Sequence, residues 1–157
     1  MKQDTQQKIL SAETVSAAML RCRQQHQKLV VTNGCFDLLH PGHLHLLEFA
    51  AAQGDVLLVA VNDDDSVRRL KGPSRPVFPI AIRLRMLAAL SCVDYVMAFT
   101  EDTPEQLIQH LNPQLLVKGG DYQPDQIAGA DWVRQQGGQV LICPELPGFR
   151  TSQLLKR

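Results

Sequence analysis

The chain has 157 residues, of which 45% are hydrophobic, so it is long enough to bury a core and we expect a single domain, residues 1–157. Sixteen Lys and Arg residues balance sixteen Asp and Glu residues, which excludes a broad basic surface for nucleic acid and means that any phosphate must be bound locally. The first eight residues are polar and no apolar run is long enough to span a bilayer, so we expect no signal peptide and no membrane contact.

Apolar segments alternate along the chain between helical and strand-like patterns. Ser11 is a good N-cap, and the apolar residues of 15–22 share one helical face, which predicts a first helix before the sheet. The strand candidates are rich in Val, Leu and Ile with little polar alternation, which is typical of a parallel sheet covered on both faces. They are Lys28–Thr32, Asp55–Val61, Tyr95–Thr100, Leu115–Lys118 and Gln139–Cys143.

Helix candidates lie between these strands. Thr103-Pro104-Glu105-Gln106 predicts a helix start with Thr103 as the cap. The resulting order predicts an α/β protein with a doubly wound five-stranded parallel sheet of Rossmann-like type, which binds ligands beyond the carboxyl ends of its strands. The predicted helices are Pro41–Ala52, Pro79–Leu90, Thr103–Leu111 and Ala130–Gln136.

The most informative segment follows the first predicted strand. Asn33-Gly34-Cys35-Phe36-Asp37 leads into His40-Pro41-Gly42-His43, which opens a helix. A helix N-terminus presents unpaired backbone N–H groups to phosphate, glycines let the backbone approach closely, and two imidazoles can donate hydrogen bonds. Histidines near a helix start are often only solvated, but here the strand, the spacing, Pro41 and the second histidine together favour a phosphate site.

Charged residues follow the next strand. Residues 62–72 run from an acidic cluster into a basic one, a pattern that fits a solvated loop with a short helix. Beside a phosphate site, Lys71 could instead meet a transferring phosphate and Asp64 a substrate hydroxyl, whereas Arg68 and Arg69 are expected to be solvated. Arg83 either covers the core with its stem or directs a bidentate fork at a substrate phosphate, and both alternatives stay open.

Two further segments offer phosphate ligands. Lys118-Gly119-Gly120-Asp121 ends a strand, and this context favours Lys118 as a ligand over a plain loop residue. Thr151 and Ser152 precede a last helix, where they either cap it or bind distal phosphates. The four cysteines form no Cys-x-x-Cys pair, which indicates reduced thiols in a cytoplasmic protein and no metal held by the chain.

The segment from Asn33 to His43 resembles the signature of the nucleotidyltransferase superfamily. With the matching segments Ala60–Asn62, Arg69–Gly72, Ser74–Val77, Glu101–Pro104, Leu116–Tyr122 and Ile127–Gly129, the chain resembles the bacterial D-glycero-β-D-manno-heptose 1-phosphate adenylyltransferases. This resemblance implies transfer of AMP from ATP to the sugar phosphate, for lipopolysaccharide or related glycoconjugates. Many such enzymes are fused to a sugar kinase, for which this chain has no room, so we expect a stand-alone adenylyltransferase.

From the residues and this resemblance we expect catalysis by His40, His43, Lys71 and Lys118, and acceptor binding by Asp37, Asp64, Lys71 and Arg83. The nucleotide-binding residues are expected to be Asn33, Gly34, Cys35, Phe36, His40, His43, Lys118, Gly119, Asp121, Arg150, Thr151 and Ser152. Two positions depart from the family pattern: Ala81-Ile82 replaces the usual Glu-Gln, and Arg150 replaces the usual Ser.

The expected chemistry is attack of the acceptor phosphate on the α-phosphorus of ATP, which requires no protein nucleophile. Mg²⁺ is expected to bind through the ATP phosphates, so no carboxylate cage is needed. The alternatives are a cytidylyltransferase acting on a small polyol phosphate and a nucleotide-binding module without turnover. The sequence leaves open whether the chain forms a homo-oligomer.

Overall fold

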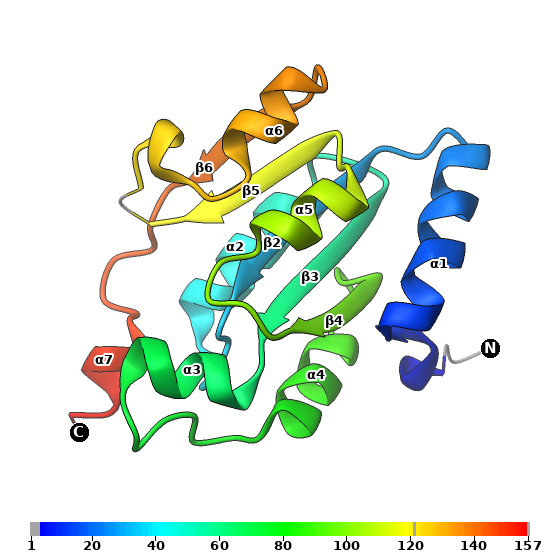
Figure 1. Ribbon diagram of the computed structural model, residues 1–157. Helices are drawn as coiled ribbons and strands as arrows, with labels where there is room; N and C mark the ends of the chain where they lie inside the picture. Colours follow the sequence, from blue (N-terminus) through cyan, green and yellow to red (C-terminus); the bar gives the residue numbers. More distant parts are fainter. Residues whose placement is uncertain (1–3, 121, 157) are drawn as a thin grey trace.

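A parallel β-sheet of six strands lies at the centre of the molecule, a computed structural model that describes residues 4–120 and 122–156 (Figure 1). The spatial order of the strands is β1-β4-β3-β2-β5-β6, and every neighbouring pair is parallel. The strands are β1 (Ile9–Leu10), β2 (Leu29–Gly34), β3 (Val56–Asn62), β4 (Tyr95–Phe99), β5 (Leu115–Gly119) and β6 (Gln139–Cys143).

The predicted α/β class and the parallel sheet are confirmed, but the predicted number of five strands is wrong. The missed strand, β1, contains two residues and pairs with β4 at the edge of the sheet, with Ile9 opposite Val96. It also precedes α1, so the first helix does not come before the whole sheet. A strand of two residues is too short to show a hydrophobic periodicity in the sequence.

The predicted helices are present with ends shifted by one or two residues. Residues 64–71, expected as a solvated loop with a short helix, form α3, whose acidic first turn and basic last turn complement the helix dipole. Besides two short 3₁₀ segments, Thr5–Lys8 and Pro124–Gln126, the helices are α1 (Ala12–Gln24), α2 (Pro41–Ala51), α3 (Asp64–Lys71), α4 (Ile80–Ala88), α5 (Glu105–Leu111), α6 (Ala130–Gln135) and α7 (Thr151–Leu154).

The start of α5 differs from the prediction. The helix begins at Glu105, with Pro104 before it, and no side chain makes a capping hydrogen bond there. Thr103 is therefore not the cap. The N-terminus of α1 agrees with the prediction, because Ser11 precedes it and the Ser11 backbone N–H donates to the Thr14 hydroxyl over 2.8 Å.

Both faces of the sheet are buried, as the continuous apolar strands predicted. On β3, Leu57, Val59 and Val61 pack in the cluster that contains residues of α2 and α4. Leu58 and Ala60 point to the opposite face and pack in the cluster that contains residues of α1, α5 and α6. Helices thus cover both faces and leave the carboxyl ends of the strands, near α3 and α7, as the open edge (Figure 1).

No helix in the described part of the chain is both long and apolar enough to cross a membrane.

Candidate functional site

The site lies where the order of the strands reverses. From β2 the chain continues to β3 and β4 on one side, and later returns to β5 and β6 on the other side of β2. Helices on opposite faces leave a crevice at such a point, beyond the carboxyl ends of the two central strands. Here those ends are Asn33-Gly34 on β2 and Lys118-Gly119 on β5.

Two adjoining pockets occupy this edge, with volumes of about 460 Å³ and about 500 Å³. The first extends toward α2 and the segment 143–151, and the second toward α3 and the loop before α5. Nine residues line both pockets and so form the wall between them: Asn33, Gly34, Cys35, Phe36, His43, Lys71, Lys118, Tyr122 and Thr151.

His40 is the N-cap of α2 in the first pocket. Its Nδ1 accepts a hydrogen bond from the Gly42 backbone N–H over 3.1 Å, so the proton of the neutral ring lies on Nε2. A Cβ at position 42 would lie 2.9 Å from both the His40 ring and the Phe149 carbonyl oxygen. Glycine at this position therefore lets the C-terminal segment pack against the start of α2.

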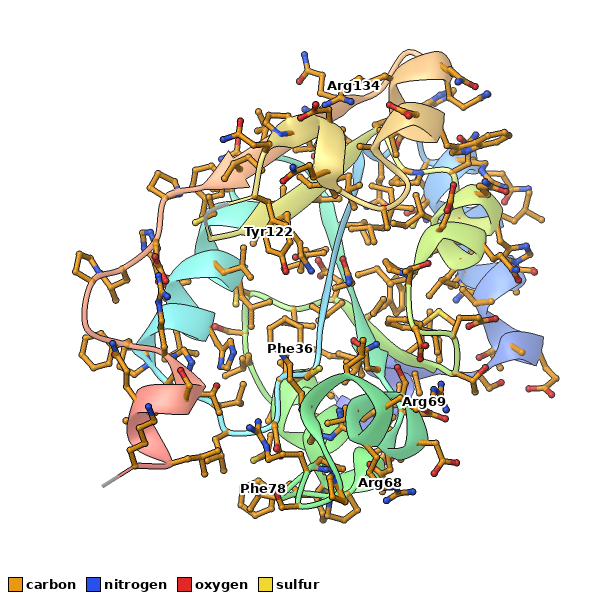
Figure 2. All side chains as sticks on the ribbon, turned by 60° about the vertical axis from the view of Figure 1, so that its left-hand side comes forward. Phe36, Arg68, Arg69, Phe78, Tyr122 and Arg134 are labelled. Carbon is orange, nitrogen blue, oxygen red and sulfur yellow. The ribbon has the colours of Figure 1, made fainter. Side chains whose placement is uncertain are left out.

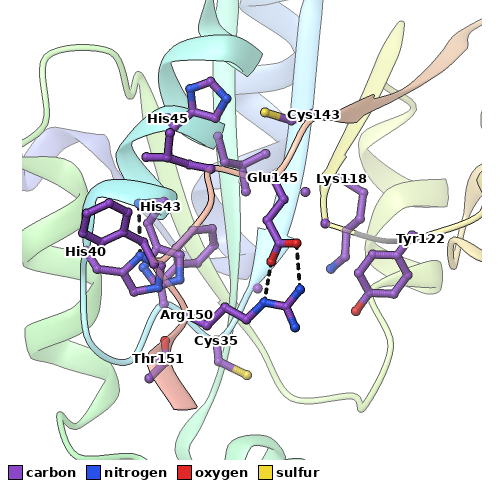
Figure 3. Close-up of a pocket in the computed structure, with 18 of the residues that line it drawn as sticks. Cys35, His40, His43, His45, Lys118, Tyr122, Cys143, Glu145, Arg150 and Thr151 are labelled. Atoms are coloured by element: carbon purple, nitrogen blue, oxygen red, sulfur yellow. Dashed lines mark hydrogen bonds and ion pairs between the residues drawn. The ribbon is translucent and has the colours of Figure 1, made fainter. Parts of the chain in front are cut away.

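His43 lies one helical turn further, beside His40. The two rings stack with centroids 3.8 Å apart, and the Phe36 ring lies 5.2 Å from His43 (Figure 3). Burial, together with the neighbouring His40, lowers the pKa of His43 to about 4, and burial also lowers the pKa of His40. Both imidazoles are therefore mainly neutral at pH 7 in the free protein, so each carries a single ring N–H, and that of His40, on Nε2, can donate to an anion.

The turn after β2 forms the floor of both pockets. Phe36 has a backbone φ of 46°, in the left-handed region, and its ring is buried. A Cβ at position 34 would lie 3.0 Å from that ring, so Gly34 allows the turn to close. Burial raises the pKa of the Cys35 thiol, which therefore stays protonated at neutral pH and does not act as a nucleophile.

Lys118 supplies a cation to both pockets. Its Nζ donates to the Asn33 carbonyl oxygen over 3.2 Å and lies 5.2 Å from the centre of the Tyr122 ring. Burial lowers the pKa of Lys118 to about 8, and the charge of nearby Lys71 acts in the same direction. The ammonium group is still mostly protonated at pH 7, but an incoming anion would stabilise it further.

The C-terminal segment closes one side of the first pocket. Arg150 precedes α7 and makes two hydrogen bonds to the Glu145 carboxylate, at 2.6 Å and 2.7 Å (Figure 3). Arg150, predicted to bind the nucleotide, thus lines the first pocket and forms an ion pair with Glu145. Thr151 and Ser152 are the first residues of α7; Thr151 lines both pockets and Ser152 the second.

Other predicted residues also reach the site. Lys71 ends α3, is exposed and lines both pockets, while Gly119 lines the first. Arg68 and Arg69 are about half exposed, as predicted for solvated side chains (Figure 2). Arg68 pairs with Asp65, and Arg69 pairs with Asp102. The predicted residue Asp121 lies outside the described residues.

Arg83 and Asp64, both predicted to bind substrate, have partners within the protein in this structure. The Arg83 side chain is fully buried, and its guanidinium donates to the carbonyl oxygens of Phe78, Cys35 and Asn62 and to the Asp64 carboxylate, all within 2.9 Å. Neither residue lines either of the two pockets described above. The alternative in which Arg83 covers the core from the surface is wrong, because its side chain is fully buried. Its binding of a substrate phosphate stays a prediction, and in this structure its donors serve partners within the protein.

Asp37, predicted to bind the acceptor, lines the second pocket and is held by a neighbouring loop. Its carboxylate is 1% exposed and accepts from Arg75 Nε and from the backbone N–H groups of Val77 and Phe78. Burial alone would raise its pKa, but these hydrogen bonds outweigh burial and lower it. Asp37 is therefore an ionised carboxylate that anchors the loop between α3 and α4.

Arg75 and Glu145 line the pockets but were missed from the sequence. Glu145 could have been suspected from its spacing of five residues before Arg150. Arg75 lies in Ser74–Val77, a segment that matches the family pattern, but its role was not predicted because its partner Asp37 is 38 residues away.

This chain is similar in sequence and in structure to known proteins. Residues 31–147 match the family model described as cytidylyltransferase-like. The bifunctional protein HldE of Coxiella burnetii (strain RSA 493 / Nine Mile phase I) is 52% identical over 149 residues, which are 95% of this chain and 31% of that protein. The HldE of Halorhodospira halophila (strain DSM 244 / SL1) is 54% identical over 141 residues, 90% of this chain and 30% of that protein.

The chain therefore spans about a third of the length of these relatives. Among solved structures, the lipopolysaccharide core biosynthesis protein from Thermoplasma volcanium GSS1 superposes with a TM-score of 0.61 at 28% identity, covering 76% of this chain and 97% of that chain.

The Arg83 contacts predict a large loss of stability in Arg83→Ala. Three buried carbonyl groups and Asp64 would lose their donor, so we expect the free energy of unfolding to fall by about 3–5 kcal/mol. Chemical denaturation measures this change. Arg85→Ala, an exposed arginine on the same helix, is the matched control and should change it by less than about 0.5 kcal/mol. Equal stability of the two variants would contradict the structural role of Arg83.

The lowered pKa of Lys118 predicts that the affinity for a nucleoside triphosphate falls as the pH rises above about 8, where the free site loses its proton. Calorimetric titration with a non-hydrolysable ATP analogue between pH 6.5 and 9.5 measures this. In Lys118→Arg the guanidinium keeps its charge, so the decline should disappear. If the affinity falls equally with pH in the wild type and in Lys118→Arg, the fall comes from a group other than Lys118.

Proposed function

The chain belongs to the cytidylyltransferase-like family, and on that premise we propose that it transfers AMP from ATP to D-glycero-β-D-manno-heptose 1-phosphate, giving ADP-heptose and pyrophosphate. It is a nucleotidyltransferase. The observation that carries the proposal is the pairing of His40 and His43 at the start of α2 with Lys118 at the end of β5. The identity of the sugar is supported by the motif resemblance over most of the chain and by the HldE relatives.

The two pockets suit two substrates that react with each other. The triphosphate would occupy the first pocket, with its α-phosphate at the dividing wall, and the acceptor would occupy the second. An acceptor phosphate oxygen attacks the α-phosphorus, one new P–O bond forms, and the bond to the oxygen of the leaving pyrophosphate breaks. The attacking oxygen is already ionised, so no general base is needed and catalysis depends on alignment and charge stabilisation.

The neutral histidines suit this task. The Nε2–H of His40 and one ring N–H of His43 are held in place by the capping bond and the ring stack, so they need no reorganisation when charge develops on the phosphates. Lys118 adds a positive charge at the wall between the pockets, and Lys71 adds one from the end of α3. We assign these four side chains to stabilisation of the transition state.

The residues present also fit a magnesium ion held by the nucleotide. In the described ranges 4–120 and 122–156, no three His, Cys, Asp or Glu side chains gather as metal ligands. The described pocket carboxylates Asp37, Asp102 and Glu145 are each paired with an arginine. Mg²⁺ would therefore be bound by the triphosphate oxygens, where it would neutralise part of their charge.

Pyrophosphate release tests the proposal directly. Purified protein with Mg²⁺ is given each of the four nucleoside triphosphates together with the α and β anomers of heptose 1-phosphate, glucose 1-phosphate or glycerol 3-phosphate. We expect the highest kcat/KM with ATP and the β anomer. A higher kcat/KM with CTP and glycerol 3-phosphate would replace the adenylyltransferase by a cytidylyltransferase, and nucleotide binding without release would indicate a module without turnover.

His43→Ala is expected to lower kcat by about 10²- to 10³-fold, the usual effect of removing one preorganised donor. The melting temperature should fall by only a few degrees, because the ring lines the pockets and belongs to neither hydrophobic cluster of the core. His110→Ala, an exposed histidine bonded to Ser16, is the control and should keep the activity. A folded His43→Ala variant with normal turnover would refute the catalytic role.

A further inference from the structure

Of the residues predicted to bind the acceptor, only Lys71 brings an unpaired positive charge to the lining of the second pocket, as the structure describes it. Asp64 and Arg83 do not line this pocket, and Asp37 is negatively charged and so would repel a phosphate. If the proposed function holds, the acceptor brings a phosphate with up to two negative charges into this pocket. A cation with unused N–H groups is therefore the side chain to look for.

Arg75 has this character. It lines the second pocket, its side chain is 15% exposed, and its Nε donates to Asp37 Oδ2 over 2.6 Å. Within the described part of the chain, its two terminal nitrogens, Nη1 and Nη2, make no hydrogen bond under normal geometric limits. The Nε edge of the guanidinium is thus fixed by Asp37, and the N–H groups of Nη1 and Nη2 remain able to donate to a ligand.

The anchor of Arg75 is rigid. Asp37 is held by the backbone N–H groups of Val77 and Phe78, which lie two and three residues after Arg75 in the chain. The loop therefore folds back on the same carboxylate that orients its arginine. This arrangement costs little further side-chain entropy when an anion binds, because the guanidinium plane is already fixed.

Other cations approach the same place. Lys71 and Lys118 line the second pocket with Arg75, and the charges of all three act on the Cys35 thiol in the shared wall. The acceptor phosphate must lie at this wall, because it attacks the α-phosphate across it. Arg75 is on the acceptor side only, since it does not line the first pocket.

We propose that Arg75 binds the phosphate of the acceptor through its Nη1 and Nη2 groups, and that Asp37 positions it. A planar guanidinium can hold two phosphate oxygens at once, which leaves a third oxygen to attack. The assignment rests on the proposed function for the identity of the acceptor as a sugar phosphate. It defines the ligand class as a phosphate monoester, whichever polyol or sugar carries it.

The test separates acceptor binding from ATP binding. Calorimetry measures the Kd of heptose 1-phosphate with a non-hydrolysable ATP analogue present, and the Kd of the analogue alone. We expect Arg75→Ala to weaken acceptor binding by about 10- to 100-fold, as for the loss of a charged hydrogen-bonding group, and to change the Kd of the analogue by less than about twofold. Arg75→Lys should recover part of the loss, because it restores the charge without the fork.

Two further variants control the result. Arg68→Ala removes an exposed arginine that lines neither pocket and should leave both dissociation constants unchanged. Asp37→Asn removes the charge that orients Arg75 and should weaken acceptor binding with little change in the Kd of the analogue. Thermal unfolding of every variant confirms that it is folded at the assay temperature.

The outcomes distinguish this inference from the proposed function. If the wild type binds the sugar phosphate without releasing pyrophosphate, the proposed function fails while the Arg75 assignment is still decided by the variants. An unchanged acceptor Kd in folded Arg75→Ala overturns the assignment. An equal loss of affinity for acceptor and analogue also overturns it, because that result would show a general distortion of the site.

Discussion

The buried guanidinium of Arg83 holds together the segments that form the site. From α4 it donates to Cys35 at the end of β2, to Asn62 at the end of β3, to Asp64 at the start of α3 and to Phe78 in the loop before α4. Burying a charged group is costly, and here four acceptors offset that cost. These contacts fix the turn after β2 and the start of α3 relative to each other. The positions of Cys35 and Lys71 in the pocket walls therefore depend on Arg83, which lines neither pocket.

The electrostatics of the site favour an incoming anion without giving the chain a net charge. Burial lowers the pKa of Lys118 to about 8 and of His43 to about 4, so these donors hold less positive charge in the free protein than they would in water. The carboxylates that line the described pockets are each neutralised by an arginine. An anion bound there would stabilise the protonated forms. The site is thus suited to the highly charged phosphates of the proposed reaction although the formal net charge of the chain is zero.

The two pockets differ in how they hold their donors. In the first, a helix start and two stacked histidines are fixed by local bonds, such as the one from Gly42 to His40. In the second, a loop is fixed by a distant carboxylate, since Asp37 binds the segment 75–78 across nearly forty residues of sequence. Lys118 lies at the wall between them with its carbonyl partner on β2. A local motif and a long-range ion pair therefore meet at the wall that the two pockets share.

Much of this organisation could be predicted from the sequence, because it depends on local patterns. The apolar runs predicted five of the six strands and the burial of both faces, and His40-Pro41 marked the start of α2 within one residue. Parallel strands bring their carboxyl ends to one edge, so Lys118 and His43 could be expected near each other. The two-residue β1 was missed because its pairing with β4 comes from the sheet and not from its own residues.

Side-chain partners far apart in the sequence were decided only by the tertiary structure. Arg83 is bonded to Cys35, 48 residues away, and Asp37 to Arg75, 38 residues away. A charged residue has the same local pattern whether it meets a substrate or a buried carbonyl, and only the packed chain determines which partner it finds.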